Sequence, residues 1–506
     1  MKKNNRHFYD WEFKKRFAAA IIATAAMLLG CAGDCRALDS GAQAEVVALS
    51  LDDVSRLVLK NNPDIQMAKY DAYIRRTDLK DARSIFDTML SLQAAYLNDR
   101  RKTSSTLLGT KSTTTDYSLG LEKKLPSGTT LGISADDSRD FSNSAFSSFP
   151  TGHEASVKFS LRQPLGNNFF GMIDRGRIKI TRLDIENSDF QAIVRIEQAL
   201  AQAQTAYWRL VLKQEELKTA RAMLEKAEQL YAVFKDKHAL GLVEDAELFG
   251  VEANVAQRRS SIAALTHERT MAKNEVLLSL HEEDLNIVIV PQDALDISER
   301  ALDWEENLRR ALEQRRDYKQ AQNDVAMKNI ELRLKRNSRW PQVDLEASFL
   351  HNGLEASQAK AWENLTQEDN PQWYMGLSVQ VPLENRAASS KHEKAQWEKA
   401  KALIALKKTE SIIAVEINNS VDAVNNTIEK LKLQERIVSL QENKLLFEEQ
   451  RFAKGRSDTD TLIRYQEDLQ QAQLALSGVR FEQKKAMIDL LLAENSLLDL
   501  YWKEAL

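Results

Sequence analysis

Cysteine and histidine are scarce in this chain, and their scarcity removes several classes of protein. Of the 506 residues only two are cysteine, Cys31 and Cys35, and both lie close to the amino terminus. The rest of the chain therefore cannot hold a disulfide framework or a thiolate metal site. The seven histidines show no metal-ligand spacing. There is also no phosphate-binding glycine loop and no nucleophile elbow. We therefore expect no enzyme, no metal and no cofactor.

Glycine and proline are also few, at 17 and 8 residues. With 28% charged and 43% hydrophobic residues, the composition favours long helices with solvated faces over a loop-rich enzyme. The formal net charge of -4 provides no concentrated basic surface. No nucleic-acid partner is therefore expected.

Residues 1–37 have the pattern of a signal peptide. Basic residues precede an apolar run, Phe17 to Leu29, which is shorter than the roughly 20 residues of a membrane-spanning helix. The sequence is compatible with two alternative processing sites. Residues 28–31 resemble a bacterial lipobox, which would be cleaved before Cys31 and acylated on it. Residues 35–37 would instead suit an ordinary signal peptidase that cuts after Ala37.

Two glycine-centred breaks, at Gly241 and Gly455, organise the rest of the chain. A basic residue precedes each glycine, acidic residues follow it, and a leucine comes later at the same distance in both. Glycine permits the left-handed backbone that ends a helix, and acidic residues suit the start of the next one. The chain is therefore predicted to contain the same helical hairpin twice, with its tips at these glycines.

A second internal match supports a duplication. Asp64 and Asp317 differ by 253 positions, and at that offset residues from Arg56 to Ala94 repeatedly meet identical ones without a gap. In the first copy Ser50 is a predicted helix cap, and the helix is interrupted at residues 61–64 and then runs to about residue 84. We predict a first repeat at 50–281 and a second at 303–495. A linker at 282–302 with a short strand, and a tail at 496–506, are predicted to form an equatorial belt.

Alternating apolar residues predict strands within 87–163 and 341–382. Such strands fit a soluble sheet or a membrane barrel. Aromatic residues near the strand ends, Tyr96, Phe349, Trp373 and Tyr374, favour the barrel. Pro164 and Pro382 are predicted exits from strand to helix, because proline lacks a ladder donor. An extra hairpin at 113–136, followed by a loop at 138–153, either widens the barrel or stands outside it.

Long helices are predicted after each exit. Apolar residues at seven-residue steps from Ile196 to Tyr231 form an a/d seam. The first pair of helices is placed at about 184–239 and 244–281, and the second at 386–453 and 458–495. Helices of this length are typical of a rod or tube.

Taken together, these features resemble the TolC family of outer-membrane efflux proteins. The resemblance is carried by residues 51–54 and 62–64, the exits at Pro164 and Pro382, and the two glycine tips. It implies a mainly α chain with a membrane β-barrel portion. Three copies would share one outer-membrane barrel, and their duplicated antiparallel helical hairpins would form an α-barrel tunnel through the periplasm of a bacterium.

The resemblance also implies partners: a periplasmic adaptor docked at the tips, an inner-membrane pump bound to that adaptor, and outer-membrane lipid. The expected docking residues are Gly241, Leu242, Val243, Gly455, Arg456 and Ser457. For the periplasmic aperture, the family places acids slightly further from the tip glycine, where this chain has Thr461 and Arg464. Our hypothesis is a mixed network of Arg456, Asp458, Asp460 and Arg464; the alternative is that these are simply solvated charges.

A rival interpretation is a periplasmic coiled-coil adaptor or a structural lipoprotein without a pore. Such a protein would have a single helical hairpin flanked by small β-domains. This chain is instead predicted to have two hairpins, each joined through alternating strands. The sequence leaves open the cargo, the partner pump, and whether the duct serves efflux or protein secretion.

Overall fold

The computed structural model describes residues 46–101, 111–144, 149–295, 302–367 and 370–501. The predicted signal peptide with Cys31, residues 296–301 of the linker and residues 502–506 of the tail lie outside these described residues. Contacts divide the chain into two units, and the described part of the smaller one is residues 46–47 and 286–288. Strands β1 (Val46–Leu49) and β6 (Val288–Pro291) form a two-stranded sheet. The strand predicted in the linker is therefore confirmed. All elements from α2 to α5 and from α6 to η2 lie in the larger unit, as do residues 48–49 of β1 and 289–291 of β6.

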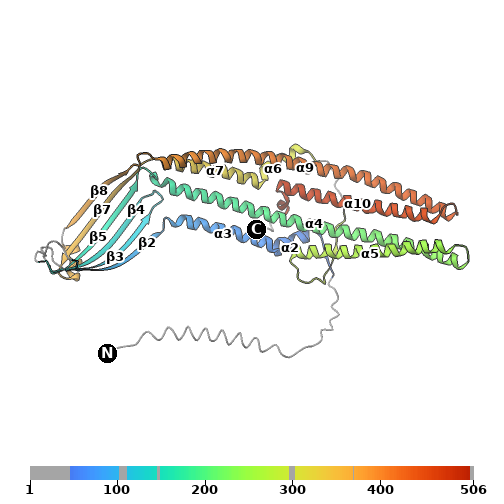
Figure 1. Ribbon diagram of the computed structural model, residues 1–506, viewed down its shortest axis with the longest axis horizontal. Helices are drawn as coiled ribbons and strands as arrows, with labels where there is room; N and C mark the ends of the chain where they lie inside the picture. The colour runs from blue at the N-terminus through green and yellow to red at the C-terminus, as the bar shows by residue number, and fades with distance from the viewer. Residues whose placement is uncertain (1–45, 102–110, 145–148, 296–301, 368–369, 502–506) are drawn as a thin grey trace, which may run out of the picture. The chain divides into compact units, whose positions relative to one another are not determined.

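Two sets of helices with matching lengths follow one another along the chain (Figure 1). The first set is α2 (Leu51–Asn61), α3 (Pro63–Ser84), α4 (Met172–Ala239) and α5 (Asp245–Leu280). The second is α6 (Trp304–Gln314), α7 (Arg316–Asn337), α9 (Arg386–Ala453) and α10 (Thr459–Glu494). Corresponding helices have 11, 22, 68 and 36 residues in both sets. The predicted pair of long helical hairpins is confirmed.

Six strands form one antiparallel sheet at one end of the helices (Figure 1). They are β2 (Thr88–Asp99), β3 (Ser112–Lys124), β4 (Thr130–Ser142), β5 (Thr151–Pro164), β7 (Gln342–Glu355) and β8 (Pro371–Gln380). Their spatial order is β2-β3-β4-β5-β7-β8, so β2 and β8 are the two edges. The described strands of one chain form an open sheet, and the helix α8 (Gln358–Gln367) lies between β7 and β8 in the chain.

The extra hairpin of the first copy belongs to the sheet. Arg316 follows Pro63 by 253 positions, whereas Arg386 follows Met172 by only 214. The difference, 253 less 214, is 39 residues that the first set holds in excess between its short and long helices. This stretch contains β3 and β4, which lie between β2 and β5. The extra hairpin predicted at residues 113–136 is therefore part of the sheet.

The loop predicted at 138–153 is wrong at both ends. β4 continues to Ser142 and β5 begins at Thr151. The ladder extends into this stretch, since Phe141 pairs with Thr113 on one side and with Thr151 on the other. The two exits also differ. Pro164 is the last residue of β5, whereas β8 ends at Gln380, before Pro382.

Local capping explains where the short helices begin. The Ser50 hydroxyl accepts the backbone N–H of Asp53, and the Asp53 carboxylate accepts that of Ser50, so the predicted cap is a full capping box. Asn62 caps α3 through the N–H of Asp64 at 2.9 Å, with Pro63 in the first turn. The interruption at residues 61–64 is thus a junction between two capped helices.

The long helix α4 begins earlier than predicted. It starts at Met172 and not near Asp184, after Gly171 adopts a φ of 70°. The predicted a/d seam is buried at Ile196, Ala203, Leu210 and Leu217, and then passes to Met223, Ala227 and Phe234. A seam drifts in this way because 3.6 residues per turn do not divide seven evenly. At about 1.5 Å per residue the helix is about 100 Å long.

Two apolar clusters hold the helices together. One joins α6, α9 and α10 through Ala311, Ile413, Ile417, Val421, Val424, Ile428 and Leu490. The other joins α4 to the second hairpin through Met223, Val438, Leu445, Leu462, Leu469 and Ala472. The core of the larger unit therefore runs along helix seams, and the sheet lies outside it.

Candidate functional site

An unbroken row of six apolar side chains crosses one face of the sheet. Its members are successive cross-strand partners, one from each strand: Leu90, Leu121, Ile133, Phe159, Phe349 and Trp373. Residues two positions along each strand share this face, and many of them are apolar as well, for example Leu92 and Met375. Leu92, Trp373 and Met375 are 77%, 78% and 78% exposed. A soluble monomer seldom leaves so large an apolar surface uncovered.

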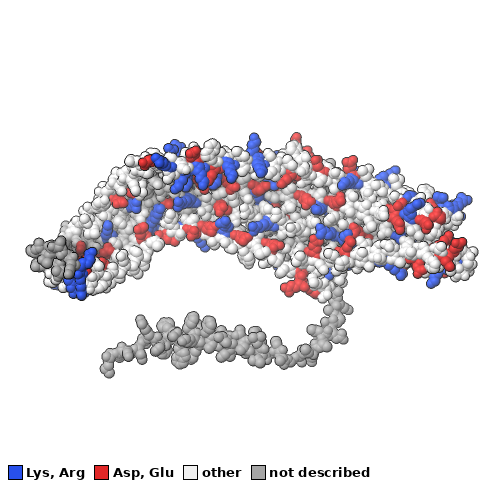
Figure 2. Space-filling view, in the orientation of Figure 1, with Lys and Arg blue, Asp and Glu red and all other residues white. Residues whose placement is uncertain are grey.

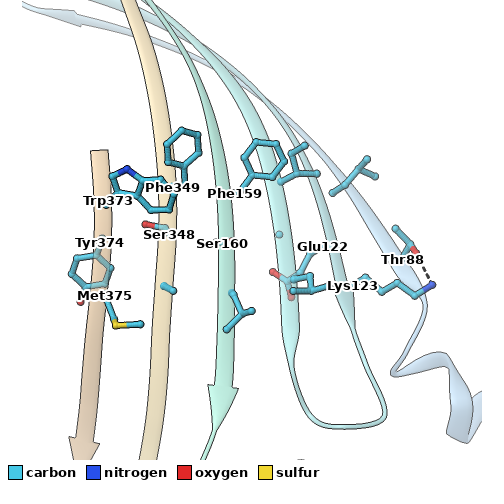
Figure 3. A pocket seen from close by; sticks show the side chains of 16 residues that line it. Thr88, Glu122, Lys123, Phe159, Ser160, Ser348, Phe349, Trp373, Tyr374 and Met375 are labelled. Carbon is cyan, nitrogen blue, oxygen red and sulfur yellow. Dashed lines mark hydrogen bonds between the residues drawn. The ribbon is translucent and has the colours of Figure 1, made fainter. Parts of the chain in front are cut away.

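Figure 3 shows the middle of this apolar face. The ring centroids of Phe349 and Trp373 are 4.6 Å apart, and Phe159 is the cross-strand partner of Phe349. A hollow of about 870 Å³ lies over these side chains. At its edge the Lys123 ammonium donates to the Thr88 hydroxyl at 3.3 Å. The hollow is therefore lined mainly by apolar side chains.

The opposite face of the sheet is polar. In β3 and β4 three aspartates accept hydrogen bonds from hydroxyl groups across the strands: Asp116 from Ser138, Asp136 from Ser118, and Asp140 from Thr114. Each pair is in direct register. A surface of hydroxyl and carboxylate groups is readily wetted. The sheet therefore has one apolar face and one polar face.

Figure 2 shows how charge is distributed on the visible side of the molecule. Red and blue residues alternate over the helices, whereas much of the sheet in this view is white. The helices thus have surfaces of mixed charge that suit water. In the part of the chain that the structure describes, no helix is both long and apolar enough to cross a membrane.

The helix α8 covers part of the apolar face and was not predicted. A Cβ atom on Gly353 of β7 would lie 2.2 Å from the carbonyl oxygen of Ala361, so only glycine fits beneath the helix. The Trp362 indole N–H donates to the Asp137 carboxylate at 2.9 Å, and the other oxygen of Asp137 lies 3.8 Å from Nδ1 of His153. Ala361, Trp362 and Leu365 have helical spacing, a signal that could have revealed α8.

The two hairpin tips have the same backbone geometry. Gly241 and Gly455 have φ values of 70° and 66°, which places both in the left-handed region. The N–H of Leu242 donates to the carbonyl of Lys237 at 3.0 Å, and that of Arg456 to Arg451 at 2.9 Å. This is the glycine helix ending predicted for both tips. Leu240 and Leu242 are 74% and 72% exposed.

The second tip contains a polar cluster that the sequence did not indicate. The Glu448 side chain is only 4% exposed and lies 3.2 Å from the guanidinium of Arg451. The hydroxyl of Ser457 donates to the same carboxylate. This network ties the loop after Gly455 back to α9. Ser457, one of the predicted docking residues, therefore also forms a hydrogen bond within its own tip.

The aperture candidates are brought to one tip, but they do not form one network within a chain. Asp458 caps α10 by accepting the N–H of Thr461 at 2.7 Å and its hydroxyl at 2.9 Å. These hydrogen bonds, with a smaller contribution from Arg464, lower the pKa of Asp458 below its usual value. Arg464 lies over the ring of Tyr465. No ion pair within the described chain joins Arg456, Asp458, Asp460 and Arg464.

A buried polar cluster lies where α5 meets α10. Arg258 is 6% exposed, and its guanidinium donates to Gln470 at 2.6 Å and to Asn254 at 3.0 Å. Burial lowers the pKa of Arg258. Its Nη2 atom has no hydrogen-bond partner within the described residues. Sequence patterns missed this cluster because Arg258 and Gln470 lie on different hairpins.

A second buried cluster joins the ends of the short helices to the long ones. Arg316 and Glu197 form an ion pair at 2.6 Å, with side chains 9% and 0% exposed. The Arg316 backbone N–H also donates to the side chain of Asn495 at 3.0 Å. The N–H of Leu498, in η2 (Leu497–Tyr501), donates to Glu197 at 3.4 Å. The described part of the tail, predicted at 496–506, therefore packs against helices of both sets.

No cofactor or metal site is indicated by these arrangements. No group of three or more histidine, cysteine or acidic residues in the described ranges is placed to hold a metal ion. His281, in the His-Glu-Glu-Asp stretch, instead ends α5 with a left-handed φ of 58°. What the geometry provides is a two-faced sheet and a pair of matched helical tips.

Part of the chain matches a known protein family. Residues 307–496 match the family model described as outer membrane efflux protein. A search of curated proteins finds no match to the chain. The match covers the long helices, β7, α8 and β8 of the second set. The family resemblance predicted from the sequence is confirmed.

Several solved structures share the fold. The CmeC outer membrane channel of Campylobacter jejuni is 14% identical, with 90% of this chain and 89% of that chain covered and a TM-score of 0.62. The outer membrane protein VceC of Vibrio cholerae is 14% identical over 88% and 95%, with a TM-score of 0.64. The open state of the Neisseria gonorrhoeae MtrE outer membrane channel is 15% identical over 88% and 89%, with a TM-score of 0.63.

Proposed function

We propose that this chain is the exit duct of an efflux system. Its residues 307–496 match the family model of the outer membrane efflux proteins. It is located in a bacterial outer membrane and extends into the periplasm. The observation that carries this proposal is the sheet, in which an apolar row six strands wide is backed by a wettable polar face. Lipid would cover the apolar face, and the polar face would line an aqueous passage.

Assembly follows from the two edges of the sheet. Among the described strands of one chain, β2 and β8 each have a partner on one side only, and open strand edges cannot be placed in lipid. A ring of copies would pair β2 of one copy with β8 of the next. The family resemblance implies three copies. This would close one shared barrel from the sheets and one tunnel from the helices.

Exposed side chains on the helices next to those edges support the same ring. α3 leads into β2 and carries Met67, Tyr70 and Ile74 at 56%, 61% and 64% exposure. α9 follows β8 and carries Trp397, Ile404 and Val415 at 69%, 71% and 60% exposure. Each trio has the spacing of one helix face. Pairing β2 with β8 of the next copy would bring these two apolar faces together.

The tips would dock the partners of the duct. Gly241 and Gly455 place Leu242, Val243, Arg456 and Ser457 on exposed turns that a periplasmic adaptor could contact. An inner-membrane pump bound to that adaptor would supply the energy. The duct itself needs no chemistry, only a wettable passage that opens and closes.

Purified protein tests this function directly. Extraction from outer membranes with detergent should yield a particle of three chains, and planar bilayers containing it should show discrete single-channel currents. Changing Tyr70 and Ile74 together to Asp should prevent trimer formation, because it would place charges in the interface between copies. Changing Leu240 to Asp, at an equally exposed tip position, should leave the trimer intact.

The rival function makes a different prediction for the same preparation. A coiled-coil adaptor or structural lipoprotein without a pore would show no current even when correctly assembled. A monomer in both the native chain and the Leu240→Asp variant would also contradict the proposal.

A further inference from the structure

We infer that the β3–β4 hairpin is an inserted section of the duct wall that widens its outer-membrane end and so sets the size of cargo that can leave. This inference rests on the proposed function. Its basis is the asymmetry between the two sets of elements. The second set crosses the sheet with two strands, β7 and β8, whereas the first uses four. The helix that precedes the strands and the helix that follows them each have the same length in both sets.

The insertion preserves the direction of every other strand. β2, β3, β4 and β5 pair antiparallel in sequence order. A hairpin adds one strand in each direction, so β5 runs opposite to β2 with or without it. The long helix after β5 therefore leaves the sheet at the same end in both cases. Such a hairpin can be added without disturbing the helical tunnel.

The insertion also preserves both faces. In the hairpin, Leu121 and Ile133 continue the apolar row between Leu90 and Phe159. On the other face, Asp116 and Asp136 accept hydrogen bonds from Ser138 and Ser118. A hairpin standing outside the wall would need neither a lipid-facing row nor a matching polar face. This one has both, in register with its neighbours.

The effect on the passage follows from geometry. Three copies of a six-stranded sheet give 18 strands, and without the hairpin the same three copies would give 12. Barrel diameter grows roughly linearly with strand number, and barrels of about 16 to 18 strands hold an open aqueous channel. The width would therefore increase by about half, and the cross-section about twofold. Bulky cargo would pass more easily through the wider barrel.

Cysteine accessibility tests whether the hairpin lines the passage. Ser118→Cys would place a thiol on the polar face, and Leu119→Cys, the next residue, would place one on the apolar face. A charged, membrane-impermeant thiol reagent should lower the single-channel current of S118C. The current of L119C should not change. The native chain treated in the same way controls for Cys31 and Cys35. An unaffected S118C channel would overturn the inference.

A deletion tests the width itself. Residues 100–150 would be replaced by a short Gly/Ser turn, so that β2 pairs directly with β5, at the level where Leu90 and Phe159 already align. Trimers of this variant should conduct about half as much current and exclude smaller neutral polymers than the native channel. Trimers with unchanged conductance and polymer cut-off would contradict the inference. If the variant does not assemble, the cysteine experiment decides.

The two proposals fail in different ways. If the untreated native chain carries no current, the duct function itself is wrong. If it conducts but S118C is insensitive to the reagent, the duct stands and only the role of the hairpin is wrong.

Discussion

Arg316 and Glu197 form an ion pair at 2.6 Å, in which both side chains are almost fully enclosed by the protein. It joins the start of α7 to the middle of α4, the points where the two sets of helices meet. Burial raises the pKa of Glu197, and the neighbouring Arg316 opposes that rise. The pair therefore holds two charges that would be costly to bury separately.

Removing one member of this pair should destabilise the protein. Arg316→Met would leave the Glu197 carboxylate buried without its cation, at a cost of about 3–5 kcal/mol. Thermal unfolding in detergent, followed by circular dichroism, should show a lower midpoint. Arg309→Met, at a position 70% exposed, should not change it. The double variant R316M/E197M should recover most of the loss, and failure to recover would show that the pair is not the cause.

Glu494 makes the stability of the protein depend on pH. Its side chain is 1% exposed, one of its oxygens has no hydrogen-bond partner within the described residues, and burial raises its pKa above 4.5. The folded protein therefore binds a proton at pH values where the unfolded chain does not. The free energy of unfolding should rise as pH falls from neutral through the folded-state pKa, and this gain is complete below 4.5.

Glu494→Gln isolates that contribution. The variant should be more stable than the native protein at neutral pH, and the gap should close as the pH is lowered. Thermal midpoints measured over a pH series check this. Glu313→Gln, at a side chain 66% exposed, should follow the native curve throughout. A gap that stays constant with pH would show that Glu494 is not the group responsible.

Replacing glycine with alanine should destabilise the protein at the tips and stabilise it within the helices. Gly241 and Gly455 have positive φ and open space around them, so alanine would be strained only through its backbone, by about 1–2 kcal/mol. Gly250 and Gly478 lie inside α5 and α10, also with open space, and alanine there should stabilise by about 0.5–1 kcal/mol. Unfolding midpoints of the four variants test this. A stabilising Gly455→Ala would contradict the left-handed tip.

Much of the fold could be predicted from the sequence because its signals are local and repeated. The bounds of α9 and α10 follow from a long apolar period, the glycine at 455 and the acidic cap at 458. The start of α4 was missed because its first turns do not join the a/d seam. There Gly176 lies against Leu334 of α7, and a Cβ atom would come within 2.5 Å of that leucine.

The buried polar contacts could not be predicted from local patterns. Arg258 and Gln470 are 212 positions apart, and each looks like an ordinary solvated residue of a helix. Glu448 likewise appears as one of many acids on α9, although Ser457 and Arg451 enclose it. Long-range packing decides which charged residues are buried. The same limit explains why the sequence suggested an aperture network that a single chain does not form.

The second tip should control the opening of the duct through its acidic residues. Asp458 and Asp460 follow Gly455, and three copies would bring six such carboxylates together. Asp458→Asn keeps a good helix cap while removing the charge, which separates gating from loss of the cap. Together with Asp460→Asn it should give larger single-channel currents that are less blocked by divalent cations.

Asp245→Asn provides the matched control, because Asp245 holds a similar place after Gly241 and its side chain is 78% exposed. It should leave conductance and cation block unchanged if the aperture lies at the second tip. An equal effect at both tips would mean that the carboxylates act only through the overall charge of the periplasmic end. No effect at either would place the gate elsewhere, and the buried Arg258 cluster between α5 and α10 would be the next position to test. Separating the two hairpins there would break the hydrogen bond from Arg258 to Gln470, but it would also let water reach the guanidinium nitrogen that has no partner within the described residues.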